Sequence, residues 1–339
     1  MWLEIVAQYG LFLFKTITVV FAVILVLAVV VRLLLRMRGP RDGQLELTAL
    51  NDRLEDMNLA IQAEVLDRRR WRRLQKHRRQ LHKQRQKAVD RRCVYVLDFD
   101  GDERASGVAA LREEISALLG VVAEHDEIVV RLTSPGGLVY AYGLAASQLM
   151  RIRSREIPLT ICVDKIAASG GYMMACVASR ILAAPFAIIG SVGVVAQVPN
   201  LHRLLEKHDI DYQEYTAGEF KRTVSLFGEI DDKGRKKFQD ELEDMHRLFK
   251  EFIQGHRPAL DVEKIATGEY WPARRALDLG LVDELLTSDD YLMQCCEQAD
   301  VFGVRYRPAP ERPRRPGMVM RSLFDAALEQ LGKRFSSRV

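Results

Sequence analysis

The chain has 339 residues, of which 48% are hydrophobic and 28% are charged, and its formal net charge is +4. This composition allows one good-sized globular core plus accessory segments, so a single catalytic domain is expected. The five cysteines form no C-x-x-C pair, which argues against both a zinc site and a disulfide framework. We expect no metal and no cofactor.

An apolar run lies close to the N-terminus. It reads LFLFKTITVVFAVILVLAVVV at 11–31, about the 20 residues that a helix needs to cross a bilayer. A cleavable signal peptide is the alternative, but the run is long and no small-residue cleavage site follows it. We therefore predict a short N-terminal segment, 1–10, and a single retained transmembrane helix. Arg32, Arg36 and Arg38 come next, and the positive-inside rule places that flank on the cytoplasmic side.

Basic residues crowd into the stretch 32–92, while the remainder of the chain is roughly balanced in charge. The densest part reads RRRWRRLQKHRRQLHKQRQK at 68–87 and suits a solvated helix or a disordered linker. Such a run can lie on anionic lipid headgroups or bind nucleic acid, yet Trp71 is its lone aromatic residue. The composition favours a charged stalk or lipid contact over nucleic-acid binding.

Beyond Arg92 the pattern changes to short apolar strands that alternate with helices. Runs typical of strands occupy 94–99, 128–132 and 159–163. Strands separated by helices of this length indicate a mainly parallel sheet covered on both faces, so 93–307 is predicted to be an α/β catalytic domain. A long amphipathic helix follows, with an apolar stripe made of Phe238, Leu242, Met245, Phe249 and Phe252. The Pro- and Arg-rich tail, 308–339, is predicted to be an amphipathic surface helix or disordered.

The first motif that can carry chemistry is TSPGG at 133–137, directly after an apolar strand. Its paired glycines permit a sharp turn that leaves backbone N–H groups pointing into a cleft. Such a turn can bind an oxyanion. The same residues are also an ordinary turn composition, so this motif alone does not identify a site.

The second motif surrounds Ser169, which follows a strand and precedes Gly170, Gly171 and an apolar helix. Free N–H groups at a helix N-terminus favour negative charge that develops on a substrate oxygen. This arrangement suits acyl transfer. The alternative is that Ser169 only caps the helix.

The third motif is TAGEFKRT at 216–223, which contains Lys221 beside the apolar Phe220. A serine hydroxyl needs a base to take its proton, and a lysine serves as that base only when burial lowers its pKa. An isolated lysine is ordinarily a solvated surface residue, so this candidate depends on the other motifs. None of the seven histidines stands in a compelling catalytic context, which disfavours a Ser-His-Asp triad.

Between about residues 94 and 285 the chain resembles the signal peptide peptidase A family of Ser-Lys proteases. The matching strings, in chain order, are SPGG at 134–137, ASGGY at 168–172, IGSVGV at 189–194, the segment around Lys221, and GLVDE at 280–284. The resemblance implies that Ser169 is the nucleophile and Lys221 the general base. It also implies that the Ser191 hydroxyl orients the lysine amine, and that the N–H groups of Gly137 and Gly170 form the oxyanion hole.

The same resemblance implies a fold related to Clp protease and to the crotonase enzyme enoyl-CoA hydratase, usually assembled into rings. An apolar groove would take extended peptide or membrane-protein substrates at the bacterial inner membrane. Members that act on signal peptides are usually drawn with the catalytic domain outside the cytoplasm, whereas the charges after Val31 favour the cytoplasmic side. Two other functions stay open: a catalytically silent membrane scaffold, and an acyl-CoA hydratase-like enzyme on the same fold.

Overall fold

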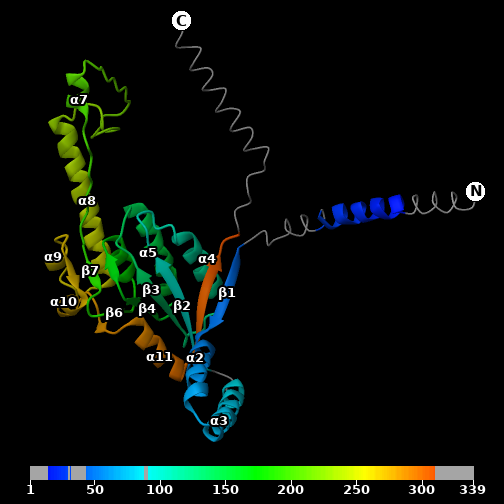
Figure 1. Cartoon of the computed structure of the whole chain (residues 1–339). Coiled ribbons are helices and arrows are strands. Elements are labelled where there is room, and N and C mark those ends of the chain that lie inside the picture. Colours follow the sequence, from blue (N-terminus) through cyan, green and yellow to red (C-terminus); the bar gives the residue numbers. More distant parts are fainter. Residues whose placement is uncertain (1–13, 30, 32–42, 88–90, 310–339) are drawn as a thin grey trace, which may run out of the picture. The chain divides into compact units, whose positions relative to one another are not determined.

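The computed structural model describes residues 14–29, 31, 43–87 and 91–309 (Figure 1). Residues 45–306 form one compact unit, which contains all but the last residue of the predicted catalytic domain, 93–307. The strands are β1 (Gln44–Ala49), β2 (Cys93–Asp100), β3 (Glu127–Thr133), β4 (Leu159–Val163), β5 (Ile166–Ala168), β6 (Arg180–Ala183), β7 (Ile188–Gly190), β8 (Tyr270–Pro272), β9 (Glu284–Leu285) and β10 (Asp300–Arg307). The helices are α2 (Leu50–Val65), α3 (Arg68–Lys87), α4 (Val108–Leu118), α5 (Val139–Arg153), α6 (Gly170–Ala175), α7 (His202–Lys207), α8 (Asp232–His256), α9 (Val262–Ile265), α10 (Ala273–Asp278) and α11 (Ser288–Gln298).

The predicted membrane span, 11–31, lies only partly within the described residues. Residues 14–29 are helical, whereas 11–13 and 30 lie outside the described ranges. Among the helices that the structure describes, none is both long and apolar enough to cross a membrane. The predicted N-terminal segment, 1–10, and nearly all of the predicted tail, 308–339, also lie outside the described residues.

A seven-stranded sheet in the order β1-β10-β2-β3-β4-β6-β9 forms the centre of the compact unit. The strands from β10 to β9 pair in parallel with their neighbours. β4 is buried along its whole length, as expected for a central strand covered on both faces. The predicted α/β class with a mainly parallel sheet is confirmed.

Helices cover the two faces of this sheet, and alternate strand residues belong to different clusters. Ile128 and Val130 of β3 belong to the large core cluster, to which α4, α5 and α6 also contribute. Val129, which points the other way, packs in a smaller cluster with Tyr291 and Leu292 of α11. This alternation is the two-residue period of a strand, and it explains why the strands read as continuous apolar runs.

Three short strands form a second sheet in the order β5-β7-β8. β5 and β7 pair in parallel, and β7 and β8 pair antiparallel. The backbone of Ser134, directly after β3, connects the two sheets: its N–H donates to Ile166 O at 2.8 Å, and its carbonyl accepts from Ala168 N at 3.0 Å. The ends of β3, β5 and β7 therefore lie close together, which brings together the SPGG turn, Ser169 and Ser191.

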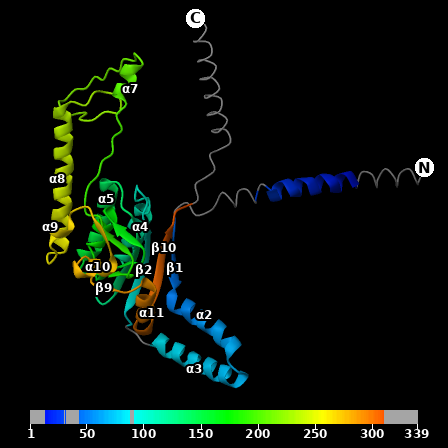
Figure 2. The ribbon, with the colours of Figure 1, turned by 60° about the vertical axis from the view of Figure 1, so that its left-hand side comes forward.

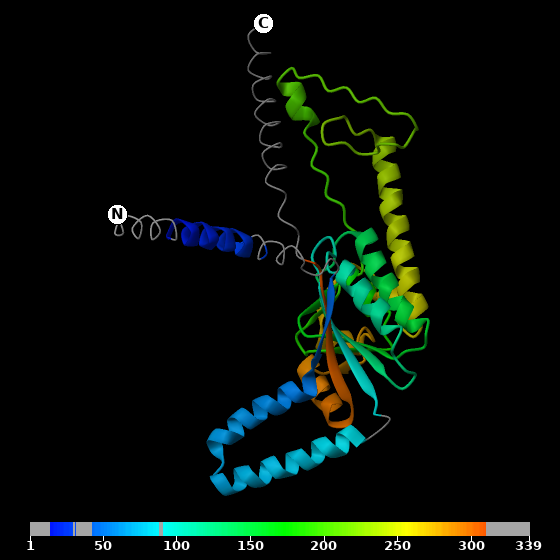
Figure 3. The ribbon, with the colours of Figure 1, turned by 90° about the vertical axis from the view of Figure 1, so that its right-hand side faces the viewer.

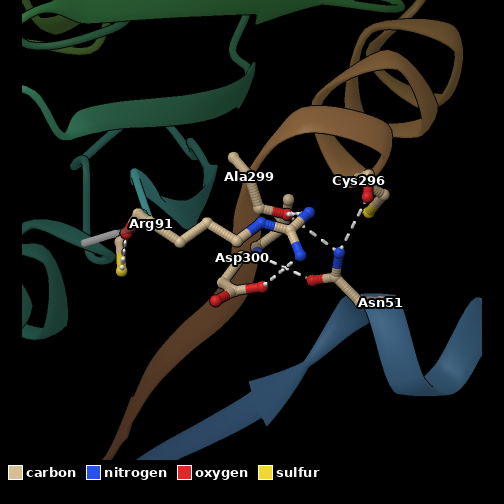
Figure 4. Close-up of polar contacts among 7 residues, drawn as sticks. Asn51, Arg91, Cys296, Ala299 and Asp300 are labelled. Atoms are coloured by element: carbon tan, nitrogen blue, oxygen red, sulfur yellow. Dashed lines mark hydrogen bonds and ion pairs between the residues drawn. The ribbon is translucent and has the colours of Figure 1, made fainter. Parts of the chain in front are cut away.

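The region predicted as a stalk, 32–92, contains a strand and two helices in its described part. β1 lies beside β10 at the edge of the main sheet, so the sheet begins well before residue 93, where the sequence placed the start of the catalytic domain. Asn51, at the start of α2, donates to the carbonyl oxygens of Cys296 (3.1 Å) and Ala299 (3.0 Å) at the end of α11 (Figure 4). Its side-chain oxygen accepts from Val301 N at 2.7 Å, so α2 is fastened to the catalytic unit.

A buried carboxyl on α4 gives the fold a predictable dependence on pH. Glu114 is 4% exposed, and its Oε1 accepts from Tyr306 N at 2.7 Å, while Oε2 is buried without a hydrogen-bond partner among the described residues. Burial raises the pKa of Glu114 above its ordinary value, although the Tyr306 amide opposes the shift. Ionisation of Glu114 therefore destabilises the folded chain relative to the unfolded one.

We predict that Glu114→Gln makes the chain more stable than wild type at neutral pH. A carboxyl with a raised folded-state pKa contributes stability that is present below its unfolded pKa and is lost as pH rises through the folded pKa. In thermal unfolding between about pH 4 and 8, the melting temperature of the wild type should fall relative to that of Glu114→Gln as the pH rises. The neighbouring, partly exposed Glu113 provides the control Glu113→Gln. Equal pH slopes for Glu114→Gln and wild type would contradict the prediction.

Candidate active site

Ser169 lies between β5 and α6 with φ 51° and ψ −119°, a region that a non-glycine residue rarely occupies. Its N–H donates to Gly190 O at 2.8 Å, and its carbonyl accepts from Met173 N at 3.0 Å. Strained backbone of this kind costs roughly 1–3 kcal/mol and persists only where the surroundings impose it. Both hydrogen bonds hold Ser169 against a cavity that it helps to line.

The SPGG turn lies directly against this serine. Gly136 has φ +89°, and a Cβ on it would come within 2.8 Å of both Ser169 Cβ and Gly170 N. Only glycine permits this approach, because a side chain would collide with the backbone of the neighbouring motif. The turn therefore brings the backbone at Gly136 directly beside Ser169 and Gly170.

Two buried hydroxyls hold the turn, and the sequence did not indicate their partnership. The Tyr142 hydroxyl donates to Asp102 O at 2.7 Å, and Ser134 Oγ lies 2.6 Å from that hydroxyl. Since Tyr142 donates its proton to the carbonyl oxygen of Asp102, the Ser134 hydroxyl donates to Tyr142 and accepts from Gly136 N at 3.1 Å. Burial raises the pKa of Tyr142, so this phenol stays protonated and keeps its role as a donor.

Ser191 occupies the corresponding position on the adjacent strand. β5 and β7 are in register, with Ala168 opposite Gly190, so Ser169 and Ser191 each follow the last paired residue of neighbouring parallel strands. Ser191 also has a positive φ, 53°, and its N–H donates to Glu269 O at 2.6 Å. The structure thus places the two predicted serines at adjacent strand ends, although Ser191 does not line the cavity.

The cavity beside Ser169 has a volume of about 340 Å³ and is mainly apolar. It brings together three of the predicted site residues, Ser169, Gly137 and Gly170. The apolar part of its lining comes from α5, α6, α8 and the chain after β7, and consists of Val139, Met173, Val194, Met245, Leu248, Phe249 and Phe252. An apolar side chain could occupy this space next to the serine.

Lys221 lies outside the cavity that contains Ser169. It is exposed, does not line the cavity, and its N–H donates to Gly218 O at 3.1 Å. The ring of the preceding Phe220 packs near Lys233 and Lys237 on the first turns of α8, at 5.4 and 5.7 Å from ring centroid to Nζ. Helix α8 lines the cavity only from Met245 onward, and Met245 lies about 12 Å beyond Lys237 along the helix axis. Within one chain the structure does not bring Lys221 to Ser169.

The loops around Lys221 form a small structure of their own at the N-terminal end of α8 (Figures 2 and 3). The Asn200 amide donates to the carbonyl oxygens of Ser225 and Gly228, both at 2.9 Å. Glu214 accepts from the Ser225 hydroxyl at 3.2 Å and forms an ion pair with Arg222 at 3.0 Å. These contacts fix the backbone next to Lys221 without help from the sheet.

Other candidate nucleophiles and metal ligands are poorly placed. Burial raises the pKa of the Cys162 and Cys176 thiols, so neither supplies a thiolate at neutral pH. Within the ranges that the structure covers, no group of three or more His, Cys, Asp and Glu side chains is placed to hold a metal ion. The nucleophile that the described cavity can offer is the hydroxyl of Ser169, with the backbone of Gly137 and Gly170 in the same lining.

Comparisons with known proteins give the family of the chain. Residues 4–149 match the model of the peptidase family S49 N-terminal region, and residues 151–301 match the peptidase family S49 model. Probable protease SohB of Haemophilus influenzae is 60% identical over 63% of this chain and 61% of its own length. Probable protease SohB of Buchnera aphidicola subsp. Schlechtendalia chinensis is 41% identical over 86% of this chain and 99% of its own length. A solved structure of a mutant 1510-N membrane-bound stomatin-specific protease, with a substrate peptide, covers 61% of this chain and 80% of its own at 18% identity and a TM-score of 0.38.

Proposed function

The chain belongs to peptidase family S49, the signal peptide peptidase A family, and we propose that it is a membrane-anchored serine endopeptidase with a Ser-Lys dyad. One observation carries the proposal: Ser169 has a strained backbone and lines an apolar cavity together with Gly137 and Gly170. Acyl transfer needs a nucleophile and oxyanion donors around one reacting carbonyl, and the proposal assigns these roles to the three residues.

In the proposed reaction, the neutral amine of Lys221 takes the proton from Ser169 Oγ, which attacks the carbonyl carbon of the scissile peptide bond. The N–H groups of Gly137 and Gly170 donate to the tetrahedral oxyanion. Lys221 then gives its proton to the leaving amine, and a water molecule, activated by the same lysine, hydrolyses the acyl-enzyme. The Ser191 hydroxyl orients the lysine amine, a role supported by its position on the strand adjacent to that of Ser169.

A second copy of the chain supplies Lys221 in this proposal. The lysine is exposed, and the loops that carry it are held by their own contacts rather than by the core. A ring of copies would present the Lys221 loops of one chain to the Ser169 cavity of its neighbour, which is the heterologous contact that generates rings. The proposal therefore makes the oligomer necessary for catalysis.

The substrate class follows from the cavity and the anchor. Aliphatic and aromatic side chains such as Val139, Leu248 and Phe249 line the space next to Ser169, which suits hydrophobic or signal-peptide-like segments. Residues 11–31 anchor the chain in the bacterial inner membrane, with the catalytic domain on the cytoplasmic side according to the charges that follow Val31. Remnant signal peptides and membrane proteins would reach such a site directly from the bilayer.

A fluorophosphonate probe tests the proposed chemistry, and we expect it to label Ser169 in the wild-type chain. Ser169→Ala should abolish both the labelling and the cleavage of a quenched hydrophobic peptide. Lys221→Arg should fail almost as badly as Lys221→Ala, because a guanidinium cannot act as a neutral base. Mass spectrometry of the labelled peptide identifies the modified residue.

The same measurement separates the alternatives. A silent scaffold or an acyl-CoA hydratase-like enzyme has no activated serine and would not react with the probe. Labelling that persists in Ser169→Ala would overturn the assignment of the nucleophile. Ser154→Ala is a suitable control, because this exposed serine lies at the end of α5, outside the cavity lining.

A further inference from the structure

The α2–α3 hairpin has no part in the proposed catalysis. Its two helices are joined at Leu66 and Asp67, and Asp67 Oδ1 accepts from the N–H groups of Arg69 (2.8 Å) and Arg70 (2.9 Å) to start α3. Arg78 of α3 reaches back to Glu55 at 2.9 Å, near the start of α2. The helices therefore run in opposite directions, side by side, as Figures 2 and 3 show.

One face of α3 is strongly cationic. Trp71, Leu74 and Arg78 are half-buried and recur at the spacing of one helical face, so this is the face toward α2. The exposed cations on the rest of the described part of α3 are Arg68, Arg69, Arg70, Arg72, Arg73 and Lys76. Arg70 is paired with Asp67, whereas the ion pairs found in the described part of the chain include no carboxylate for Arg69, Arg72, Arg73 and Lys76. We call these last four residues the cationic face.

The other helix of the hairpin exposes an apolar stripe. Met57, Ile61 and Val65 follow one another at intervals of four residues and are 49%, 65% and 75% exposed. Side chains four apart lie above one another on a helix, so they form a continuous line on α2. Single exposed apolar residues are common on protein surfaces, but an aligned set on a helix that borders a cationic helix suits an interface.

We propose that the α2–α3 hairpin docks on an anionic phospholipid surface, with the apolar stripe entering the headgroup region and the cationic face binding lipid phosphates. A bilayer interface accepts both kinds of side chain at once, because aliphatic groups enter the acyl boundary while Lys and Arg stay among the phosphates. Nucleic acid would bind the cations but would make no specific contact with Met57, Ile61 and Val65, since bases stack on aromatic rings. The observations therefore favour lipid.

This inference rests on the proposed attachment to a membrane and adds an orientation to it. Twelve residues separate Val31 from Gln44, which limits the tether to about 40 Å even when fully extended. The hairpin thus stays within reach of the surface in which 11–31 would insert. Because Asn51 fastens α2 to the end of α11, docking of the hairpin would also fix the catalytic unit relative to the bilayer.

Hydrogen exchange of the full-length chain in vesicles tests this proposal. The chain is reconstituted in phosphatidylcholine alone or with about a quarter phosphatidylglycerol. We expect amide exchange in peptides from 50–78 to slow about tenfold or more in the anionic vesicles, and added salt to reverse much of the effect. The cationic-face variant combines Arg69→Gln, Arg72→Gln, Arg73→Gln and Lys76→Gln. The stripe variant combines Met57→Ser, Ile61→Ser and Val65→Ser.

Each of these two variants should lose the slowing, and a third variant controls for net charge. It removes the same number of exposed positive charges from other elements through Arg104→Gln, Lys264→Gln, Arg274→Gln and Arg275→Gln, and it should keep the wild-type behaviour. Equal exchange in the two kinds of vesicle, equal loss in the control variant, or slowing by duplex RNA but not by vesicles would each overturn the proposal. Resistance to alkaline extraction reports separately on the anchor, and peptide cleavage on the dyad. If the chain is not retained after extraction, the same exchange comparison is made with vesicles added to the unanchored chain.

Discussion

Co-expression of Ser169→Ala and Lys221→Ala chains is expected to restore about a quarter of the wild-type peptidase activity, although each variant alone loses nearly all of it. In a ring where one chain supplies the serine and its neighbour the lysine, a site works when a Lys221→Ala chain is followed by a Ser169→Ala chain. Random assembly of equal amounts places the two in that order at about one site in four. Hydrolysis of a quenched hydrophobic peptide by the purified mixed oligomers measures the recovery.

A matched mixture separates this arrangement from a dyad within one chain. Wild type co-expressed with the Ser169→Ala/Lys221→Ala double variant should also retain about a quarter of the activity if neighbours share the site, but about half if each chain is self-sufficient. No recovery in the first mixture, together with half activity in the second, would show that the Lys221 loops must reach Ser169 of their own chain. The exposed position of Lys221 at the N-terminal end of α8 leads us to expect the first result.

Gly137→Ala is expected to lower kcat about 10²- to 10³-fold, the usual effect of losing one oxyanion donor. A Cβ on Gly137 would lie 2.1 Å from the carbonyl oxygen of Glu103, so the backbone has to move and carries the Gly137 N–H with it. Steady-state kinetics on a hydrophobic peptide would show the loss in kcat rather than in KM, because the oxyanion exists only after the attack.

Gly143→Ala is the control for this substitution. Gly143 lines the same cavity, but a Cβ there would meet no heavy atom within 4 Å. We expect kcat near the wild-type value, with any change confined to KM, and an equal or slightly higher melting temperature because alanine favours the helix. A Gly137→Ala chain that melts like wild type and keeps wild-type kcat would show that Gly137 is not an oxyanion donor.

The parts of the fold that could be predicted are those with a strong apolar pattern. β3 and β4 are buried runs of Val, Ile and Leu separated by a helix of ordinary length, and they alone indicate a parallel sheet. β1 was missed because it lies at the sheet edge and four of its six residues are exposed, so QLELTA has no continuous apolar run to distinguish it from the charged surroundings.

Some residues of the candidate site could likewise be predicted from the sequence, and others could not. Gly136 and Ser169 could be singled out because a glycine turn and a strand-to-helix serine have local signatures. The contact of Ser134 with Tyr142 could not, since it depends on how α5 leaves the turn and on where Asp102 offers a carbonyl. The position of Lys221 could not be predicted either, because no local pattern shows whether the loop that carries it folds toward its own core.

The position of β1 also affects the order of folding. Asn51 and Cys296 form a hydrogen bond although they are 245 residues apart, and β1 pairs with β10, which is made after the other described strands. Contacts between such distant residues form late, so β1 stays an open edge until synthesis has passed residue 307. A chain interrupted before Asp300 leaves β2 open as well, and open edges pair with other chains. Closure of the domain therefore depends on completing the chain, and interrupted chains should aggregate or be degraded.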